Sequence, residues 1–455
     1  MAVSSHSLRS YESSAELRAE LGHPVIDCDG HIIEPAPLVA EFLRDLVPGR
    51  VVDDFLAQRR VHPRDREVQV AWWGPPTDAH DRAAIYAPKL LHERLPELGF
   101  DFSIAYPSLG LGMVSHPDDD LRPAICRALN QYNADSVRSL GDRLTIPACI
   151  PMQNTTEALD ELDYAVAELG MRCVMLSGTV RGDGRPVLIG LDGQPDYDAV
   201  WQRCIDLGVA ATFHAGTLGQ GSRVSGLYVY NHIGAIAAAG EAIAKALVMG
   251  GVTRRFPRLN FAFLEGGVAW GALLLMDLVA HWQKRGGRNI QMLDPARVDR
   301  EAFAHLLARY GGTRFDPAVT ATIDGSRDFA PDEPDDFARA GIDNVDDLIE
   351  RFVPHFYFGC EADDRANAWG FATQLNPGGS RLNAVLGSDI GHWDVLDMRT
   401  VLVESRELVE CGAITDTDFR DLVCDNAIRL HAGMNANFFA GTAVESYATT
   451  VMENS

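Results

Sequence analysis

The sequence predicts an α/β fold, a (β/α)8 TIM barrel with long insertions after its first and sixth strands. Eight short apolar runs alternate with stretches of helical periodicity, which favours a closed barrel over an open sheet. Four of these runs end in a histidine or a carboxylate. Because the C-terminal ends of all barrel strands meet on one face, side chains far apart in sequence can share one ion there.

The predicted strands are mostly continuous apolar runs, as expected for parallel strands that are covered on both faces. They are 25–32, 102–108, 144–152, 172–177, 209–214, 260–265, 356–361 and 383–389. Helical periodicity predicts the crossover helices at 123–140, 156–169, 197–207, 233–249, 269–282, 365–373 and 398–409.

Length and composition fit one elaborated barrel domain. The chain has 455 residues, of which 46% are hydrophobic and 23% charged. We assign 25–440 to the barrel, 1–24 to an N-terminal arm and 441–455 to a C-terminal tail. Insertions 34–99 and 286–354 are too long for simple crossovers, so we expect lids, substrate loops or subunit contacts; the second is equally compatible with a solvated surface excursion.

Charge and cysteine usage restrict the partners and the compartment. The net charge of −24 argues against nucleic acid as a partner. The eight cysteines contain no CxxC pair, and we expect buried, reduced thiols in a cytoplasmic protein. The start of the chain lacks the apolar core of a signal peptide. Glu241 and Lys245 interrupt the apolar stretch 233–252 four residues apart, which favours a crossover helix over a membrane span.

The first and fifth strands supply the first candidate ligands of a metal ion. Asp29 and His31 are two residues apart, so the pleat directs both to one face. Asp27 has the same parity but lies deeper, where it is expected to support the ligands. His214 ends the fifth run and is followed by small residues that leave space above it. The alternative is that these groups only cap strand ends.

The last strand ends in Gly387-Ser388-Asp389, where a carboxylate can bind the ion and take a proton from its water. The alternative for Asp389 is a cap on the following turn. His392, three residues on, either orients substrate, acts as an acid or has no role.

Glu265 ends the sixth run inside a very apolar sequence, where an ionised carboxylate is costly without a cation or a hydrogen-bond donor. We expect it to bind the first metal ion, to bind a second one, or to act in acid–base chemistry. Glu361 occupies the same place after the seventh run. His232 precedes the Ala-rich helix, and we interpret it as the cap of that helix rather than as a ligand at the rim.

Over roughly Val25 to Phe439 the chain resembles the amidohydrolase-related branch (amidohydrolase family 2) of the metal-dependent hydrolase superfamily, which includes aromatic-acid decarboxylases. The motif elements are Asp29-Gly30-His31, Phe213-His214-Ala215-Gly216, Leu264-Glu265-Gly266-Gly267 and Gly387-Ser388-Asp389. The resemblance implies that Asp29, His31, His214 and Asp389 hold a catalytic divalent metal, often zinc or manganese.

Three departures from that branch change the expected chemistry. Asp29 stands where His or Glu is common, which makes the site richer in oxygen and more suitable for manganese. Glu265 stands where a histidine commonly acts as base or acid. The fourth run ends in Leu176-Ser177-Gly178, without a lysine to bridge two metals, which disfavours a lysine-bridged binuclear hydrolase.

The leading hypothesis is a metal-dependent hydrolase or non-oxidative decarboxylase that acts on a small carboxylate or amide. The ion would polarise the substrate or activate water, with Asp389 relaying protons and Glu265 or His392 assisting.

Two alternatives remain. The carboxylate-rich set of Asp29, Glu265 and Asp389 beside two histidines also suits iron, as in oxygen-activating monooxygenases similar to this branch. The other alternative is that the chain is a partner subunit that binds metal but is not catalytic, because Glu265 replaces the usual base. The expected partners are a small-molecule substrate and either an identical chain or a related barrel subunit, with Trp72-Trp73 offering apolar surface for an interface.

Overall fold

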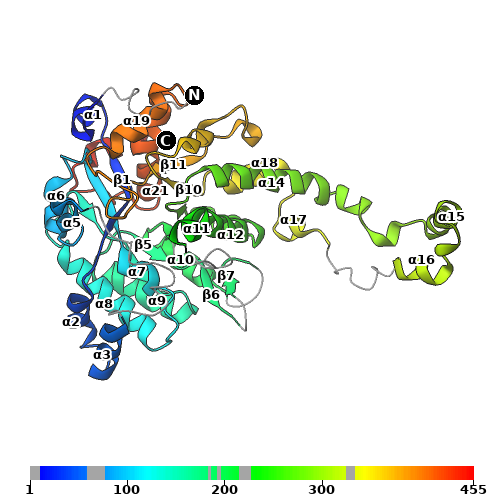
Figure 1. Cartoon of the computed structure of the whole chain (residues 1–455), viewed down its shortest axis with the longest axis horizontal. Helices are drawn as coiled ribbons and strands as arrows, with labels where there is room; N and C mark the ends of the chain where they lie inside the picture. Colours follow the sequence, from blue (N-terminus) through cyan, green and yellow to red (C-terminus); the bar gives the residue numbers. More distant parts are fainter. Residues whose placement is uncertain are drawn as a thin grey trace.

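The computed structural model describes residues 11–58, 77–182, 186–191, 196–214, 227–323 and 334–454. All eight predicted strands form (Figure 1). They are β1 (Ile26–Ile32), β2 (Phe102–Pro107), β3 (Leu144–Thr145) with β4 (Ala148–Ile150), β5 (Val174–Leu176), β8 (Ala211–Phe213), β9 (Phe261–Phe263), β10 (Phe356–Cys360) and β11 (Asn383–Leu386). The third predicted strand is interrupted and therefore carries two labels.

The strands are parallel and follow the order of a (β/α)8 barrel, but their ladders form two sheets. One has the order β1-β2-β3, and the other has the order β11-β10-β9-β8-β5-β4. The sheets meet at the interrupted third strand and again between β11 and β1. At the second joint the Asp389 amide donates to the Asp29 carbonyl (2.7 Å), and the His31 amide donates to the Ile390 carbonyl (2.8 Å). The C-terminal ends of the first and last strands are thereby held side by side.

Helices cover the strands where the periodicity places them. The crossover helices are α8 (Leu121–Ser136), α9 (Thr155–Leu162) continued by a π turn, α10 (Asp198–Leu207), α12 (Ala235–Met249), α14 (Ala269–Arg285), a 3-10 segment (Arg365–Phe371) and α19 (Val401–Glu410), followed by α21 (Asn426–Ala432). A small hairpin of β6 (Thr179–Arg181) and β7 (Pro186–Leu188) was not predicted.

By length and composition, Val229–Met249 is the one described helical stretch apolar enough to cross a membrane. In the structure, α12 buries Ile243, Ala244 and Leu247, as expected for a crossover helix. Lys245 and Glu241 form the ion pair that their spacing predicts (3.4 Å). The buried face of α12 thus packs on the barrel, whereas Val229, Tyr230 and Ile233 before it are exposed.

An aromatic layer fills the space between strands β9 and β10 and the helices outside them. The rings of Phe263 and Phe358 each pack edge-on against Trp270 of α14, with centroids 5.5 and 5.0 Å apart. A Cβ atom on Gly271 would run into the Phe358 ring. The missing side chain at Gly271 therefore lets α14 approach the sheet closely.

The described parts of the predicted N-terminal arm and C-terminal tail each contain a helix. Within the predicted N-terminal arm, α1 (Ser14–Glu20) packs beside α19, where the Leu402 amide donates to Ser14 Oγ (3.0 Å). The predicted tail contains α22 (Glu445–Glu453), which buries Ala448 and Val451. The first insertion folds into α2 (Ala36–Leu43), α3 (Gly49–Gln58), α5 (Ala79–Ala84) and α6 (Pro88–Arg94). Trp72-Trp73 lies outside the described residues.

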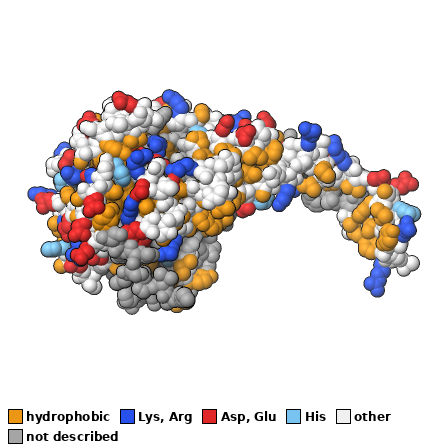
Figure 2. Space-filling view, turned by 90° about the horizontal axis from the view of Figure 1, so that it is seen from above, with side chains coloured by type: hydrophobic (Ala, Val, Ile, Leu, Met, Phe, Trp, Pro, Cys, Tyr) orange, Lys and Arg blue, Asp and Glu red, His pale blue; other side chains and the backbone are white. Residues whose placement is uncertain are grey.

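The second insertion forms a helical arm that stands away from the barrel (Figure 1). The chain leaves through the end of α14, forms α15 (Arg300–Gly311) and α16 (Pro317–Ile323), and returns through α17 (Asp336–Arg339) and α18 (Val345–Phe352). Within the described structure, α15 and α16 bury no side chain. Hydrophobic side chains gather at the tip of the arm (Figure 2).

Seven of the eight cysteines are buried, as predicted. Cys411, at the end of α19, is exposed, so the prediction of buried thiols is wrong at that position. The cause is local, because Cys411 follows the last turn of α19 and lies on its solvent side.

A buried histidine makes stability depend on pH. His431 of α21 is 3% exposed and stacks on Phe438 with centroids 4.4 Å apart. Burial lowers the pKa of His431 from 6.5 to about 3. Below pH 6.5 the unfolded chain therefore binds a proton that the folded chain does not, and stability is lost as the pH falls, by about 1.4 kcal/mol per pH unit from this group.

We predict that replacing His431 by Phe (H431F) removes this contribution. Between pH 7 and 5 the free energy of unfolding of the variant falls by about 2 kcal/mol less than that of the wild type. Urea unfolding at both pH values measures the difference. An equal loss in the two proteins contradicts the prediction.

Candidate metal centre

The ends of four strands bring five predicted residues into one cluster. His31 Nε2 and His214 Nε2 lie 3.1 Å apart. Asp29 Oδ1 lies 3.2 Å from the His214 nitrogen, and Asp389 Oδ1 lies 3.2 Å from the His31 nitrogen. Glu265 Oε2 lies 3.2 Å from His214 Nε2. All five residues are buried. The sequence thus identified side chains that share one small volume.

Two of these carboxylates depend on unusual backbone. Glu265 has a φ of 62° and Asp389 a φ of 50°, and among the described residues they are the only non-glycine positions with positive φ. This left-handed conformation is unfavourable for residues with a Cβ atom and persists only where the surrounding structure holds it. Both lie just beyond strands, after β9 and β11. The strain thus occurs at two of the candidate ligands.

Asp27 supports the cluster through the backbone rather than through the imidazoles. Its carboxylate accepts hydrogen bonds from Ser103 Oγ (2.7 Å), from the Asp29 amide (3.2 Å) and from the Ser388 amide (3.0 Å). It therefore connects β2, β1 and the end of β11. A Cβ atom at Gly30 would lie 2.5 Å from Asp27 Oδ2, so this arrangement requires glycine there. The predicted supporting role of Asp27 agrees with these contacts.

The chemistry of the donor set fits a divalent cation. Asp29 Oδ1, Glu265 Oε2 and both oxygens of Asp389 are buried and form no well-oriented hydrogen bond among the described residues, although imidazole nitrogens lie 2.7 to 3.2 Å from three of these oxygens. Burial raises the pKa of Asp29 to about 6. Burial and the Glu265 carboxylate raise the pKa of Asp389 well above its usual range. Buried oxygens without donors are costly, and a bound cation removes that cost.

The pKa values of His31 and His214 shift in opposite directions. Burial lowers the pKa of His31 well below its usual value, and His392 and His214 add to the effect. Burial also opposes charge on His214, but Asp29 and Glu265 outweigh it and raise the pKa of His214. His31 is therefore a neutral imidazole, the form that binds metal ions.

His392 is in contact with the cluster, so the alternative that it has no role is not favoured. Its ring stacks on His31 with centroids 3.7 Å apart, and its Nδ1 lies 2.7 Å from Asp389 Oδ1. Ser108 Oγ lies 3.1 Å from His392 Nε2 and 3.5 Å from His31 Nδ1. Burial lowers the pKa of His392 to about 4, although Glu265 opposes the shift. It is therefore neutral at neutral pH.

Three sets of donor atoms overlap in the cluster. They are Asp29, His31 and His214; His31, Glu265, Asp389 and His392; and His232, Glu265 and Asp394. Within each set all donor atoms lie within 4.8 Å of one another. His31 and Glu265 each belong to two sets, so neighbouring sets share a ligand.

The third set corrects one prediction and adds one residue. His232 was interpreted as a helix cap, but it ends α11 (Tyr228–His232) and its Nε2 lies 3.6 Å from Glu265 Oε1. The rejected alternative, a ligand at the rim, fits this position. Asp394 was missed. Its signal was a carboxylate in the turn after the last strand, on the face where barrel sites form.

A cavity of about 460 Å³ opens above the cluster. Its described polar lining consists of His232, Glu265, Glu361, Asp363 and Asp394. Ile233, Trp393 and Leu396 supply apolar surface. Burial and the Asp394 carboxylate raise the pKa of Glu361 to about 9. The described wall of this cavity contains no Lys or Arg.

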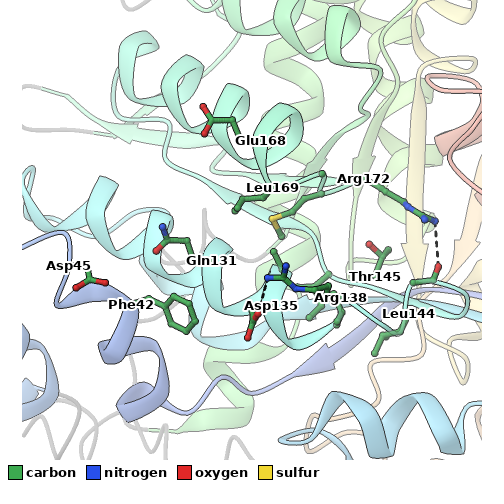
Figure 3. A pocket seen from close by; sticks show the side chains of 16 residues that line it. Phe42, Asp45, Gln131, Asp135, Arg138, Leu144, Thr145, Glu168, Leu169 and Arg172 are labelled. Atoms are coloured by element: carbon green, nitrogen blue, oxygen red, sulfur yellow. Dashed lines mark hydrogen bonds and ion pairs between the residues drawn. The ribbon is translucent and has the colours of Figure 1, made fainter.

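A larger cavity, of about 520 Å³, lies beside α2 and α8, and Figure 3 shows the side chains that line it. It is lined by residues at the start of the third and fourth strands, including Leu144 and Arg172. Asp135 and Arg138 form an ion pair there (2.9 Å). It contains no candidate ligand and lies at the N-terminal ends of the strands, where barrel enzymes do not place their chemistry.

Comparison with known proteins agrees with the geometry. A family model described as amidohydrolase matches residues 26–431. An amidohydrolase from Mycobacterium avium subsp. paratuberculosis K-10 superposes with a TM-score of 0.56 at 16% identity, covering 90% of this chain and 99% of that chain. A dihydroxybenzoic acid decarboxylase from Polaromonas sp. JS666, with bound manganese and the inhibitor 2-nitroresorcinol, gives 0.50 at 15% identity, covering 92% and 99%. At these identities the structures support the barrel fold.

We predict opposite effects of replacing Asp389 by Asn (D389N) with and without metal. Without metal, the change removes a buried carboxylate beside Glu265, so the free energy of unfolding does not fall. With manganese at about 100 times its dissociation constant, the wild type gains about 2.7 kcal/mol, whereas the variant gains less than half of this.

Urea unfolding of metal-stripped protein, with and without MnCl2, measures both quantities. The matched control is Asp135→Asn, an exposed carboxylate at the other end of the barrel, which keeps the full manganese effect. A variant that is less stable than the wild type without metal, or that gains as much from manganese, refutes the assignment.

Proposed function

The chain belongs to the amidohydrolase family, and from this membership we propose that it is a metal-dependent enzyme that hydrolyses or decarboxylates a small molecule. The observation that carries the proposal is the buried cluster around His31 and His214, in which buried oxygens of Asp29 and Asp389 lie against imidazole nitrogens and form no well-oriented hydrogen bond in the described structure. Buried carboxylate oxygens of this kind lower the stability of the fold when no cation is bound, and a bound cation removes that cost.

Asp29, His31, His214 and Asp389 would hold the ion, zinc or manganese. When bound, a divalent cation polarises a substrate oxygen or makes a water acidic enough to attack. Asp389 is the proposed proton acceptor, because its carboxylate lies among the donors that would hold the ion and its water. His392, whose Nδ1 lies 2.7 Å from Asp389 Oδ1, positions that carboxylate.

The cavity wall narrows the substrate class. Glu361, Asp363 and Asp394 line it, and its described part carries no cationic side chain. The carboxylates of Asp363 and Asp394 would repel an anionic substrate but not a neutral one, and Glu361, whose pKa burial raises to about 9, would be protonated at neutral pH. Trp393 and Leu396 offer apolar contacts. We therefore favour hydrolysis of a small neutral amide over decarboxylation of a carboxylate.

Oxygen activation is the second candidate. Its support is the share of carboxylates in the overlapping donor sets, because Asp29, Glu265, Asp389 and Asp394 suit iron or manganese at least as well as zinc. A non-catalytic partner subunit has less support, since Glu265 points into the cluster, with Oε2 3.2 Å from His214.

Turnover of two probes under defined metal and gas conditions separates these functions. We expect zinc- or manganese-loaded protein to release 4-nitroaniline from 4-nitroacetanilide without oxygen, and D389N to lower kcat by at least about 100-fold. Carbon dioxide release from dihydroxybenzoate would favour decarboxylation instead. Turnover that requires iron and consumes oxygen would favour the second candidate, and unchanged kcat in D389N would remove Asp389 from the mechanism.

A further inference from the structure

We propose that Ser108 is a positioning residue of the metal centre, whose hydroxyl fixes the tautomers of His31 and His392 and thereby keeps His31 Nε2 unprotonated for the ion. The inference rests on the proposed metal-dependent function and deepens it, because it names a residue outside the ligand set on which binding of the ion depends. Its support comes from the position of the hydroxyl, from the surroundings of each ring nitrogen and from the contacts that hold the Ser108 backbone.

The Ser108 hydroxyl contacts two stacked imidazoles. The rings of His31 and His392 have centroids 3.7 Å apart and planes 22° apart. Ser108 Oγ lies 3.1 Å from His392 Nε2 and 3.5 Å from His31 Nδ1. A hydroxyl has one proton to donate and lone pairs that accept, and a neutral imidazole has one N–H and one lone pair. The hydroxyl can therefore donate to one ring and accept from the other, and the two directions give opposite tautomers.

The surroundings of His31 favour one direction. Its Nε2 lies inside the cluster, 3.1 Å from His214 Nε2 and 3.2 Å from Asp389 Oδ1. The backbone carbonyl of Tyr106 accepts a hydrogen bond from the same ring, and a carbonyl only accepts. A proton on His31 Nδ1 serves this carbonyl and Ser108 Oγ, and it leaves the Nε2 lone pair for a metal ion. A proton on Nε2 would instead face the other ligands.

The surroundings of His392 favour the same direction. Its Nδ1 lies 2.7 Å from Asp389 Oδ1. At that separation a lone pair on Nδ1 would face a carboxylate oxygen and be repelled, so the proton belongs on Nδ1. His392 Nε2 is then unprotonated and accepts the proton of Ser108. Ser108 therefore donates to His392 and accepts from His31, and this one assignment satisfies both rings.

The main chain beside Ser108 is held by buried polar groups. Ser108 follows β2 and begins α7 (Ser108–Met113). The next amide, that of Leu109, donates to Glu34 Oε2 (2.9 Å), and Glu34 Oε1 accepts from Asn133 Nδ2 of α8 (3.2 Å). Glu34 is 3% exposed and Asn133 is fully buried. The hydroxyl thus projects from a fixed backbone, as a group that orients two rings must.

Loss of the hydroxyl would affect the two rings differently. In Ser108→Ala, His31 keeps the Tyr106 carbonyl as a partner, whereas His392 Nε2 loses its donor. The His392 proton can then move to Nε2, which turns a lone pair toward Asp389 and displaces that carboxylate. Because groups that support metal ligands typically change metal affinity by about 10- to 100-fold, we expect weaker binding of the ion.

Nitrogen-15 NMR of metal-stripped protein with labelled histidine side chains tests the assignment directly. It separates the two tautomers of each ring, and His31→Gln and His392→Gln identify the signals. We expect the wild type to carry the proton on Nδ1 of both rings. In Ser108→Ala the His392 proton shifts partly to Nε2, whereas Ser108→Thr, which keeps the hydroxyl, retains the wild-type signals.

Calorimetric titration with MnCl2 measures the consequence for the ion. We expect Ser108→Ala to bind manganese at least about tenfold more weakly than the wild type, and Ser108→Thr to restore most of the affinity. The matched control is Ser405→Ala, which removes a buried hydroxyl on α19 that has no hydrogen-bond partner among the described residues. It keeps the wild-type affinity and tautomers. Thermal melting without metal checks that all variants fold.

The outcomes separate this inference from the proposed function. A proton on His31 Nε2 in the wild type, or a Ser108→Ala variant with wild-type tautomers or wild-type affinity, overturns the inference. A Ser108→Thr variant that behaves like Ser108→Ala also overturns it, because the hydroxyl is then not responsible. A wild type that shows the expected tautomers but binds no manganese refutes the proposed function and keeps the hydrogen-bond assignment.

Discussion

The arrangement of this barrel depends on the burial of several carboxylates at one mouth, out of contact with water. Asp29, Glu265 and Asp389 lie beside two imidazoles in a low-dielectric volume, where their charges repel one another and their oxygens find few donors. The fold holds them there against this cost and against the backbone strain at Glu265 and Asp389. A bound cation would offset the repulsion between these carboxylates. The strained backbone at Glu265 and Asp389 would then hold both side chains in position for the ion before it binds.

The hydrogen bonds that position the site residues also join the two sheets of the barrel. Asp27 accepts hydrogen bonds from both the first strand and the residue before Asp389, across the joint where the two sheets meet. The Asp389 amide donates to Asp29 at the same joint. Stability and site geometry are therefore coupled: a change that loosens β1 from β11 also separates two of the ligands, although they lie in different halves of the sequence.

The strands and the inner ligands were predictable because each depends on a local pattern: an apolar run, and the residue type that ends it. Asp29, His31, His214 and Asp389 fall where strand ends must meet. His232 and Asp394 were not predictable in the same way, because they lie in turns whose direction is set by the left-handed backbone at Glu265 and by packing against Trp393. The arm was recognised only as a long insertion, since its path depends on contacts that hydrophobic periodicity does not describe.

The joint between β1 and β11 also sets the order of events when the chain is made. Asp29 leaves the ribosome 360 residues before Asp389, and Asp27 waits as long for the Ser388 amide. Until the last strand emerges, the nascent protein has only part of its ligand set and lacks the carboxylate that closes it. The two halves of the cluster therefore come together only after most of the barrel has been synthesised, so the geometry of the site depends on the completion of the fold.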